Sequence, residues 1–204
     1  MTDRVAVVIG CAPCWPADLG ALDALLGHDD YDACAVNGAG WHYLGRIAYW
    51  VSAHGLHLVE WLPLRAARGG NQDYRALGNF APHQAAAPVE RWQRPNRGGS
   101  SALLAVEAML ELGHPRVVLV GCPLEGDRRR SYGEDGGPGD TGRVEGGVCV
   151  PNPDVPAGYA IYRSAAWGIL QAERGDRVRS MSGWTSELFG VPTAAWLRGE
   201  TCDE

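Results

Sequence analysis

Short apolar runs that end in glycine mark the clearest elements of the chain. Arg4–Gly10 and Arg116–Gly121 are continuous and rich in β-branched residues, which is typical of strands buried on both faces of a parallel sheet. Tyr31–Val36 is a third candidate strand. Before it, Ala17–Leu26 repeats leucine at helical spacing and stops at Gly27. This alternation of strand and helix predicts an α/β fold.

The remaining pattern adds weaker elements of the same kind. It predicts strands at Trp50–Ala53, Asp73–Phe80 and Arg177–Ser182, helices at Leu56–Arg68, Ala102–Leu112 and Tyr159–Arg174, and a short helix that starts at Thr185. Asn37–Gly40 predicts a turn, because these residues tolerate left-handed backbone conformations. Residues 81–97 and 122–157 predict loops, the second long enough to be a mobile binding loop. We expect residues 1–204 to form one α/β domain, an open, mostly parallel sheet with helices on both faces and a ligand cleft at the carboxyl ends of its strands.

The composition narrows the choice of partner and compartment. The 204 residues include 46% hydrophobic and 21% charged residues, with a net charge of −6. An acidic chain does not favour nonspecific binding to nucleic acid or to anionic membranes. No apolar run is long enough to span a bilayer and no export signal precedes the first strand, so we expect a cytoplasmic protein. The six cysteines have irregular spacings, which predicts thiols and no disulfide framework.

The first candidate site is the loop that joins the first strand to its helix. Gly10 and Pro13 lie in this loop, where open α/β sheets bind ligands and where the start of the next helix can hold an anion. The loop is equally explained as a plain turn. Cys11 and Cys14 have the spacing of a redox pair, which leaves a thiol redox site open.

A second candidate site lies at the start of the helix expected from Ala102. Gly99 lets a ligand approach the backbone, and the hydroxyls of Ser100 and Ser101 suit either a phosphate or a helix cap. Asn37 follows a strand, so its amide is placed to read a base or sugar edge, or to form a turn. Asn37, Gly99, Ser100 and Ser101 are therefore candidate contacts for the phosphate, sugar or base of a nucleotide.

Titratable residues near strand ends supply candidate chemistry. His54 follows an expected strand, where a histidine can act as acid or base near neutral pH, or serve a structural role. Glu125 and Asp127 lie just beyond another strand and are candidate bases or metal ligands, while Arg128 and Arg163 are candidate anion-binding residues. The alternative for Glu125, Asp127 and Arg128 is a set of solvated loop charges, and the alternative for Arg163 is a place at the rim of the core, on the helix expected over Tyr159–Arg174.

Four segments of the chain together resemble a known family. VVIGCAPCWPADL, CAVNGAGW, GGSSALLAVEAMLELG and RVVLVGCPLEG occur in this order, and the set is similar to the sialyltransferase-like group of Rossmann-type proteins of bacteria and to related phage- and prophage-encoded proteins. The resemblance implies a Rossmann-like fold in the cytoplasm of a bacterial host cell. It also implies that the nucleotide of a CMP-activated sugar binds at Gly10, Pro13, Asn37, Ser100 and Ser101.

We therefore expect a nucleotide or nucleotide-sugar binding transferase of the glycosyltransferase-like kind. No Asp-x-Asp pair follows a strand, which favours transfer without a metal, and the carboxylates of the 122–157 loop leave a divalent metal open. The partner is a small molecule, the nucleotide or nucleotide sugar, and a homo-oligomer is left open. One alternative is a noncatalytic phage-encoded binding or assembly protein, because no histidine follows His114, whereas the family's base is a histidine in the C-terminal region. A second alternative is a thiol redox protein that uses Cys11 and Cys14.

Overall fold

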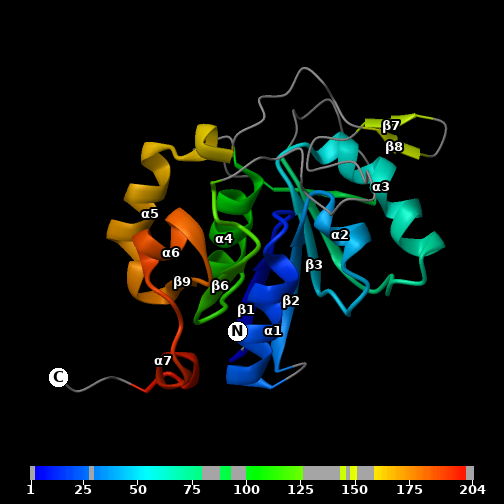
Figure 1. The fold of residues 1–204 in the computed structure, drawn as a ribbon. Coiled ribbons are helices and arrows are strands. Elements are labelled where there is room, and N and C mark those ends of the chain that lie inside the picture. Colours follow the sequence, from blue (N-terminus) through cyan, green and yellow to red (C-terminus); the bar gives the residue numbers. More distant parts are fainter. Residues whose placement is uncertain are drawn as a thin grey trace.

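Seven of the described strands form one open parallel sheet. The computed structural model describes residues 3–27, 30–79, 88–92, 100–125, 143–145, 148–150 and 159–200. The sheet contains β1 (Val5–Ile9), β2 (Tyr31–Val36), β3 (Tyr49–Ser52), β4 (Arg75–Gly78), β5 (Glu90–Arg91), β6 (Val117–Val120) and β9 (Val178–Ser180). These seven strands lie in the order β5-β4-β3-β2-β1-β6-β9 and all pair in parallel (Figure 1). The chain thus moves outward from β1 to β5 and then returns to the other side of β1.

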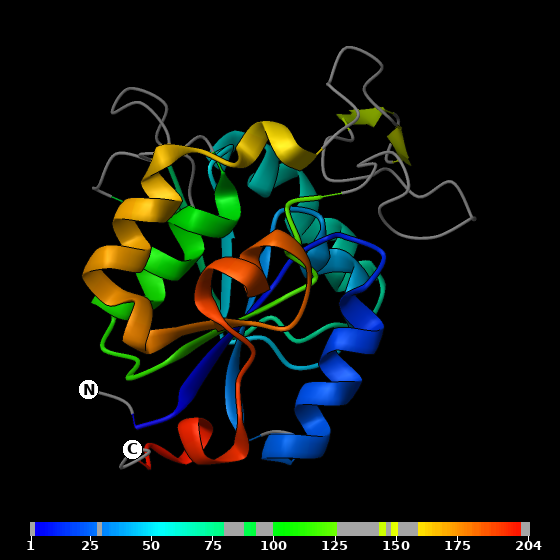
Figure 2. The same ribbon diagram turned by 60° about the vertical axis from the view of Figure 1, so that its left-hand side comes forward.

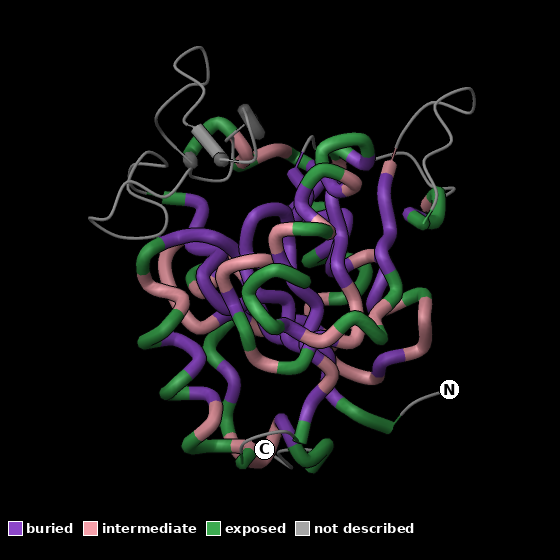
Figure 3. The backbone as a smooth tube through the Cα atoms, turned by 90° about the vertical axis from the view of Figure 1, so that its right-hand side faces the viewer, coloured by how far each residue is buried: buried purple, intermediate pink, exposed green. Residues whose placement is uncertain are grey.

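Helices cover both faces of this sheet (Figure 2). They are α1 (Trp15–Leu26), α2 (Ala39–His42), α3 (Gly55–Ala67), α4 (Ser101–Glu111), α5 (Ala165–Arg174), α6 (Gly183–Phe189) and α7 (Ala194–Arg198), with short 3-10 turns η2 (Tyr159–Tyr162) and η3 (Gly175–Arg177). Leu22, Trp61 and Leu197 bring α1, α3 and α7 into the core on one face. Trp167 and Phe189 bring α5 and α6 into the core on the other face, which they share with α4. The buried backbone is therefore concentrated in the strands between the two layers (Figure 3).

The expected fold class is confirmed, since the chain is an α/β domain whose sheet is open and, in its seven strands, entirely parallel. The two continuous apolar runs that are rich in β-branched residues form β1 and β6, which are adjacent in the sheet and pair with Ala6 opposite Val117. Their side chains are almost completely buried, as the runs predict for strands covered on both faces. The continuous apolar pattern thus reports burial on both sides of the sheet.

Two expected elements were wrong in their extent. The turn at Asn37–Gly40 is shorter, because Asn37 takes a left-handed conformation (φ 49°) and α2 already begins at Ala39. The single helix expected over Tyr159–Arg174 is divided into η2 and α5. Ser164 at the N-cap of α5 has an extended backbone (φ −94°, ψ 161°), which ends one helical run before the next begins.

Short elements also occur in the two expected loops. β5 lies in the first of them, within residues 81–97. The second, 122–157, falls mainly outside the described residues, and its described parts are Cys122–Glu125 and the antiparallel pair β7 (Arg143–Glu145) and β8 (Val148–Val150). In the part of the chain that the structure describes, no helix has both the length and the apolar character needed to cross a membrane.

A buried arginine fixes the corner between α2 and α3. The side chain of Arg65 has no solvent exposure. Its guanidinium donates hydrogen bonds to the main-chain carbonyl oxygens of Gly40, Tyr43, Gly45 and Asn71 at 2.6–3.0 Å, and to the side-chain oxygen of Asn71. Burial lowers the pKa of this guanidinium from its usual value, and the five hydrogen bonds offset the cost of burying the charge.

We expect Arg65→Lys to lower the free energy of unfolding by about 3 kcal/mol, because an ammonium has three donors and leaves buried carbonyls without a partner. Urea denaturation measures this loss. The control is Arg46→Lys, since Arg46 is exposed and pairs with Asp73 at 2.6 Å, and this change should cost under about 1 kcal/mol. Equal losses in the two variants would contradict the role given to Arg65.

Candidate functional site

The strand order reverses between β1 and β6, and this junction is where open α/β sheets bind ligands. Two loops meet there, one after each strand. The Gly10 N–H donates to Val120 O at 2.8 Å, and a Cβ atom at Gly10 would collide with Cys122 Sγ and Gly121 O. Gly121 has φ 62° and lies against the Cβ of Trp15. Glycine is therefore required at both positions, because the two loops approach each other backbone to backbone.

A buried carboxylate that the sequence analysis missed lies at this junction. Asp18, in the first turn of α1, is only 8% exposed. Its Oδ2 accepts hydrogen bonds from the Gly121 N–H at 2.9 Å and from the Ser182 hydroxyl at 2.7 Å. One carboxylate oxygen thus joins α1, the loop after β6 and the segment after β9. The charge that a bound anion would supply is already supplied by the protein.

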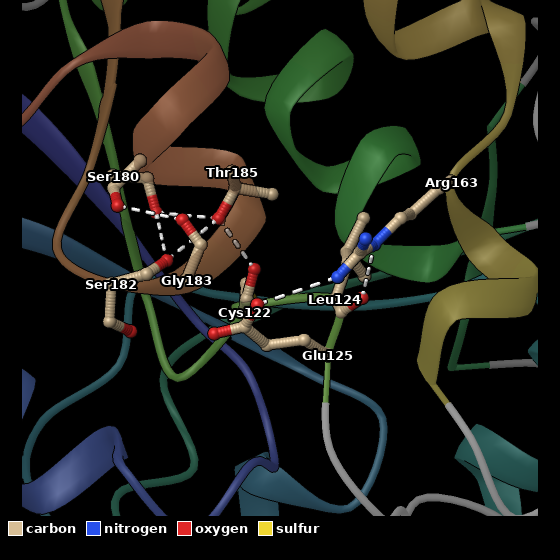
Figure 4. A network of polar contacts seen from close by, with 9 residues as sticks. Cys122, Leu124, Glu125, Arg163, Ser180, Ser182, Gly183 and Thr185 are labelled. Atoms are coloured by element: carbon tan, nitrogen blue, oxygen red, sulfur yellow. Dashed lines mark hydrogen bonds and ion pairs between the residues drawn. The ribbon is translucent and has the colours of Figure 1, made fainter.

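Hydroxyl groups extend this contact along the C-terminal segment (Figure 4). The Thr185 hydroxyl donates to Cys122 O at 2.8 Å and lies 2.8 Å from the Ser180 hydroxyl. Ser180 and Thr185 are both almost completely buried. The segment after β9 is therefore held against the end of β6 by a continuous set of polar contacts.

The loop after β6 also carries backbone strain and an ion pair. Leu124 has a left-handed backbone (φ 49°), which costs a residue with a side chain roughly 1–2 kcal/mol. Its carbonyl oxygen accepts a hydrogen bond from Arg163 Nε at 2.9 Å. Arg163 Nη2 lies 3.4 Å from Glu125 Oε2, and the guanidinium lies over the Trp184 ring at 5.4 Å from its centre. Strain of this kind persists where neighbouring contacts hold it, and it is frequent at ligand sites.

The expected nucleotide-binding residues form internal hydrogen bonds around the ends of β2 and β3. Asn37 is buried, and its Oδ1 accepts from the Ser52 hydroxyl at 2.8 Å. Ser100 caps α4 by accepting from the Leu103 N–H at 3.5 Å. Ser101 accepts from the Ala53 N–H at 3.0 Å. The structure therefore brings Asn37 and Ser101 to one edge, where both also serve the fold.

His54 belongs to the same edge. It occupies the N-cap position of α3, its side chain is exposed, and its N–H donates to the Ser52 hydroxyl at 2.9 Å. The His57 ring lies 5.9 Å away, centre to centre. Pro13 is exposed in the loop after β1, whereas the expected residues Gly99, Asp127 and Arg128 lie outside the described residues.

The two cysteines of the first loop point to different partners. The Cys11 thiol is buried and donates to Val36 O at 3.4 Å. The Cys14 sulfur lies 3.5 Å from the Ser182 hydroxyl, and burial, with a smaller contribution from the Asp18 carboxylate, raises the pKa of Cys14 to about 11. A redox thiol needs a low pKa, so this geometry does not favour that chemistry. Within the described ranges, no three or more His, Cys, Asp or Glu residues are placed to hold a metal ion.

Comparisons with known proteins supply no family for the chain. No family model, no curated protein and no solved structure matches it. Its function is therefore inferred from the geometry of this edge.

We expect Asp18→Asn to lower the free energy of unfolding by about 2 kcal/mol, because it replaces charge-assisted hydrogen bonds by neutral ones and places an amide group in the junction. Ser182→Ala should lower it by about 1 kcal/mol, because it removes the hydroxyl that donates to Asp18. Chemical denaturation of both single variants and of the double variant measures the coupling. The double variant should lose less than the two single losses added together. Strictly additive losses would mean that the two side chains do not act on each other.

We expect iodoacetamide to alkylate Cys14 slowly at pH 8, because a thiol with a pKa of about 11 is only about 0.1% thiolate at that pH. The rate should rise about tenfold for each added pH unit up to pH 10. Asp18→Asn removes a carboxylate that raises this pKa, so it should speed the reaction. Mass spectrometry of the Cys14 peptide follows the rate, and rapid alkylation at pH 7 would support a redox thiol instead.

Proposed function

We propose that the chain binds a nucleotide or nucleotide sugar at the carboxyl ends of β1, β2 and β3 and transfers the activated group, as a glycosyltransferase-like enzyme. The observation that carries this proposal is the reversal of strand order between β1 and β6. A reversal of this kind gathers several strand-end loops at one edge of a parallel sheet and leaves room there for a ligand.

The start of α4 is the part of this edge best suited to the phosphate. Gly121 N–H at the β1–β6 junction is already bonded to Asp18, so the ligand's anionic end is directed elsewhere. Helix α4 begins at Ser101, next to the end of β3, and the free amide groups of a helix N-terminus attract anions. Asn37 lies beside it at the end of β2, where its Oδ1 accepts from the hydroxyl of the fully buried Ser52 at 2.8 Å, and we assign Asn37 to the base and sugar.

His54 is the residue we assign as general base. Its ring is exposed at the end of β3, where it can take a proton from an acceptor hydroxyl. The acceptor oxygen then bonds to the anomeric carbon as the bond from that carbon to the phosphate oxygen breaks, and the nucleotide leaves with the negative charge. The second expected base among the described residues, Glu125, pairs with Arg163 instead.

Calorimetry and thermal shift with CMP, UDP, ADP and a CMP-sugar test the binding. Ligand at 100 times its dissociation constant should add about 2.7 kcal/mol to the free energy of unfolding. His54→Gln should leave this binding unchanged and slow hydrolysis of the CMP-sugar by about 10²- to 10⁴-fold.

His57→Gln is the matched control, because His57 is also exposed, lies one turn further along α3 and faces Glu60 at 3.4 Å. It should leave both binding and hydrolysis unchanged. If none of these nucleotides raises the melting temperature, the transferase proposal fails. If both histidine variants hydrolyse the sugar at the wild-type rate, His54 is not the base.

A further inference from the structure

Two contacts hold the Arg163 side chain in position, but only one exposed carboxylate in the described part of the chain neutralises its charge. Its Nε donates to Leu124 O at 2.9 Å, and its guanidinium lies over the Trp184 ring. Both contacts fix the direction of the side chain, and neither a carbonyl nor an aromatic ring carries a full negative charge. The only acid paired with Arg163 in the described part of the chain is Glu125, at 3.4 Å.

Three other described arginine–carboxylate pairs are tighter, whereas Arg4 and Asp32 also lie 3.4 Å apart. Arg75 and Glu90 form two hydrogen bonds, at 3.0 and 2.7 Å. Arg46 and Asp73 approach to 2.6 Å. The Arg163–Glu125 distance is longer than a good charge-assisted hydrogen bond, and the two side chains are 33% and 50% exposed. The pair is therefore weak and open to exchange with a solvent-borne anion.

The position of the Glu125 side chain depends on a glycine at residue 183. Gly183, at the start of α6, has φ 65°, and a Cβ atom there would lie 2.8 Å from Glu125 Oε1 and in contact with Pro123. The absence of a side chain at position 183 thus leaves room for the Glu125 carboxylate between Arg163 and the backbone of α6. Figure 4 shows Glu125 in this position, next to the polar contacts that close the C-terminal segment.

We propose that Arg163 binds the phosphate group of the anionic ligand. In the absence of the ligand the Glu125 carboxylate pairs with the Arg163 guanidinium, and the phosphate displaces it. The site lies just beyond the carboxyl end of β6, one strand from β1. A phosphate offers more negative charge than a carboxylate and suits the two parallel N–H groups of a guanidinium, so the exchange favours the ligand. This inference rests on the proposed function, because it assigns a second contact to the same nucleotide or nucleotide sugar.

Calorimetry with inorganic pyrophosphate and with CMP tests this exchange in the full-length protein. Glu125→Gln should tighten pyrophosphate binding about two- to fivefold, because it removes the competing charge of an exposed ion pair. Arg163→Gln should weaken binding about tenfold or more. Arg163→Lys, which keeps the charge but loses the paired N–H groups, should fall between Arg163→Gln and the wild type.

Glu90→Gln is the matched control, because Glu90 is also 50% exposed and also pairs with an arginine. It makes the same change in net charge and should leave binding unchanged. Urea midpoints show that each variant is folded. Equal tightening in Glu90→Gln and Glu125→Gln, or unchanged binding in Arg163→Gln, would overturn the exchange.

The two proposals fail in different ways. If CMP binds the wild type and every variant equally, the nucleotide site stands and the exchange at Arg163 is wrong. If pyrophosphate binding follows the predicted order but no nucleotide binds, the exchange stands as an anion site and the nucleotide proposal is wrong. If neither pyrophosphate nor any nucleotide binds the wild type, both are wrong.

Discussion

Asp18 places one carboxylate oxygen between the Gly121 amide and the Ser182 hydroxyl, and the arrangement of the whole carboxyl edge depends on this contact. The three residues come from the first helix, the loop after β6 and the C-terminal segment. A carboxylate that is buried at this depth needs hydrogen-bond donors, and two donors share its Oδ2. Its two partners are therefore held in place, and the ends of β6 and β9 stay next to the start of α1.

This filled junction divides the edge into two flanks. On one flank, the ends of β2 and β3 meet the start of α4, where Asn37, Ser101 and His54 lie. On the other flank, the strained loop after β6 meets Arg163. The Asp18 carboxylate lies between the two flanks and is itself bonded to the protein on both sides.

The sequence predicts the parts of this structure that local patterns determine. The apolar runs of β1 and β6 and the leucine spacing of α1 give the fold class, because burial on both faces leaves a continuous apolar signal. Long-range contacts leave no such signal. Asp18 looks like a solvated acid in the first turn of an amphipathic helix, and its partners lie 103 and 164 positions away. The break in the helix expected over Tyr159–Arg174 likewise coincides with an Arg163 contact to Leu124, 39 positions away.

Arg65 fixes the path of the backbone around α2 through hydrogen bonds to the main chain. Four of its five hydrogen bonds go to main-chain carbonyls, which every amino acid carries. The guanidinium therefore recognises the path of the backbone around α2 and is indifferent to most of the side chains along it. Gly40 and Gly45 belong to the same corner, and a Cβ atom at either would collide with Trp50 or Tyr43. The course of the backbone here thus depends on one buried arginine and on the glycines whose carbonyls it binds.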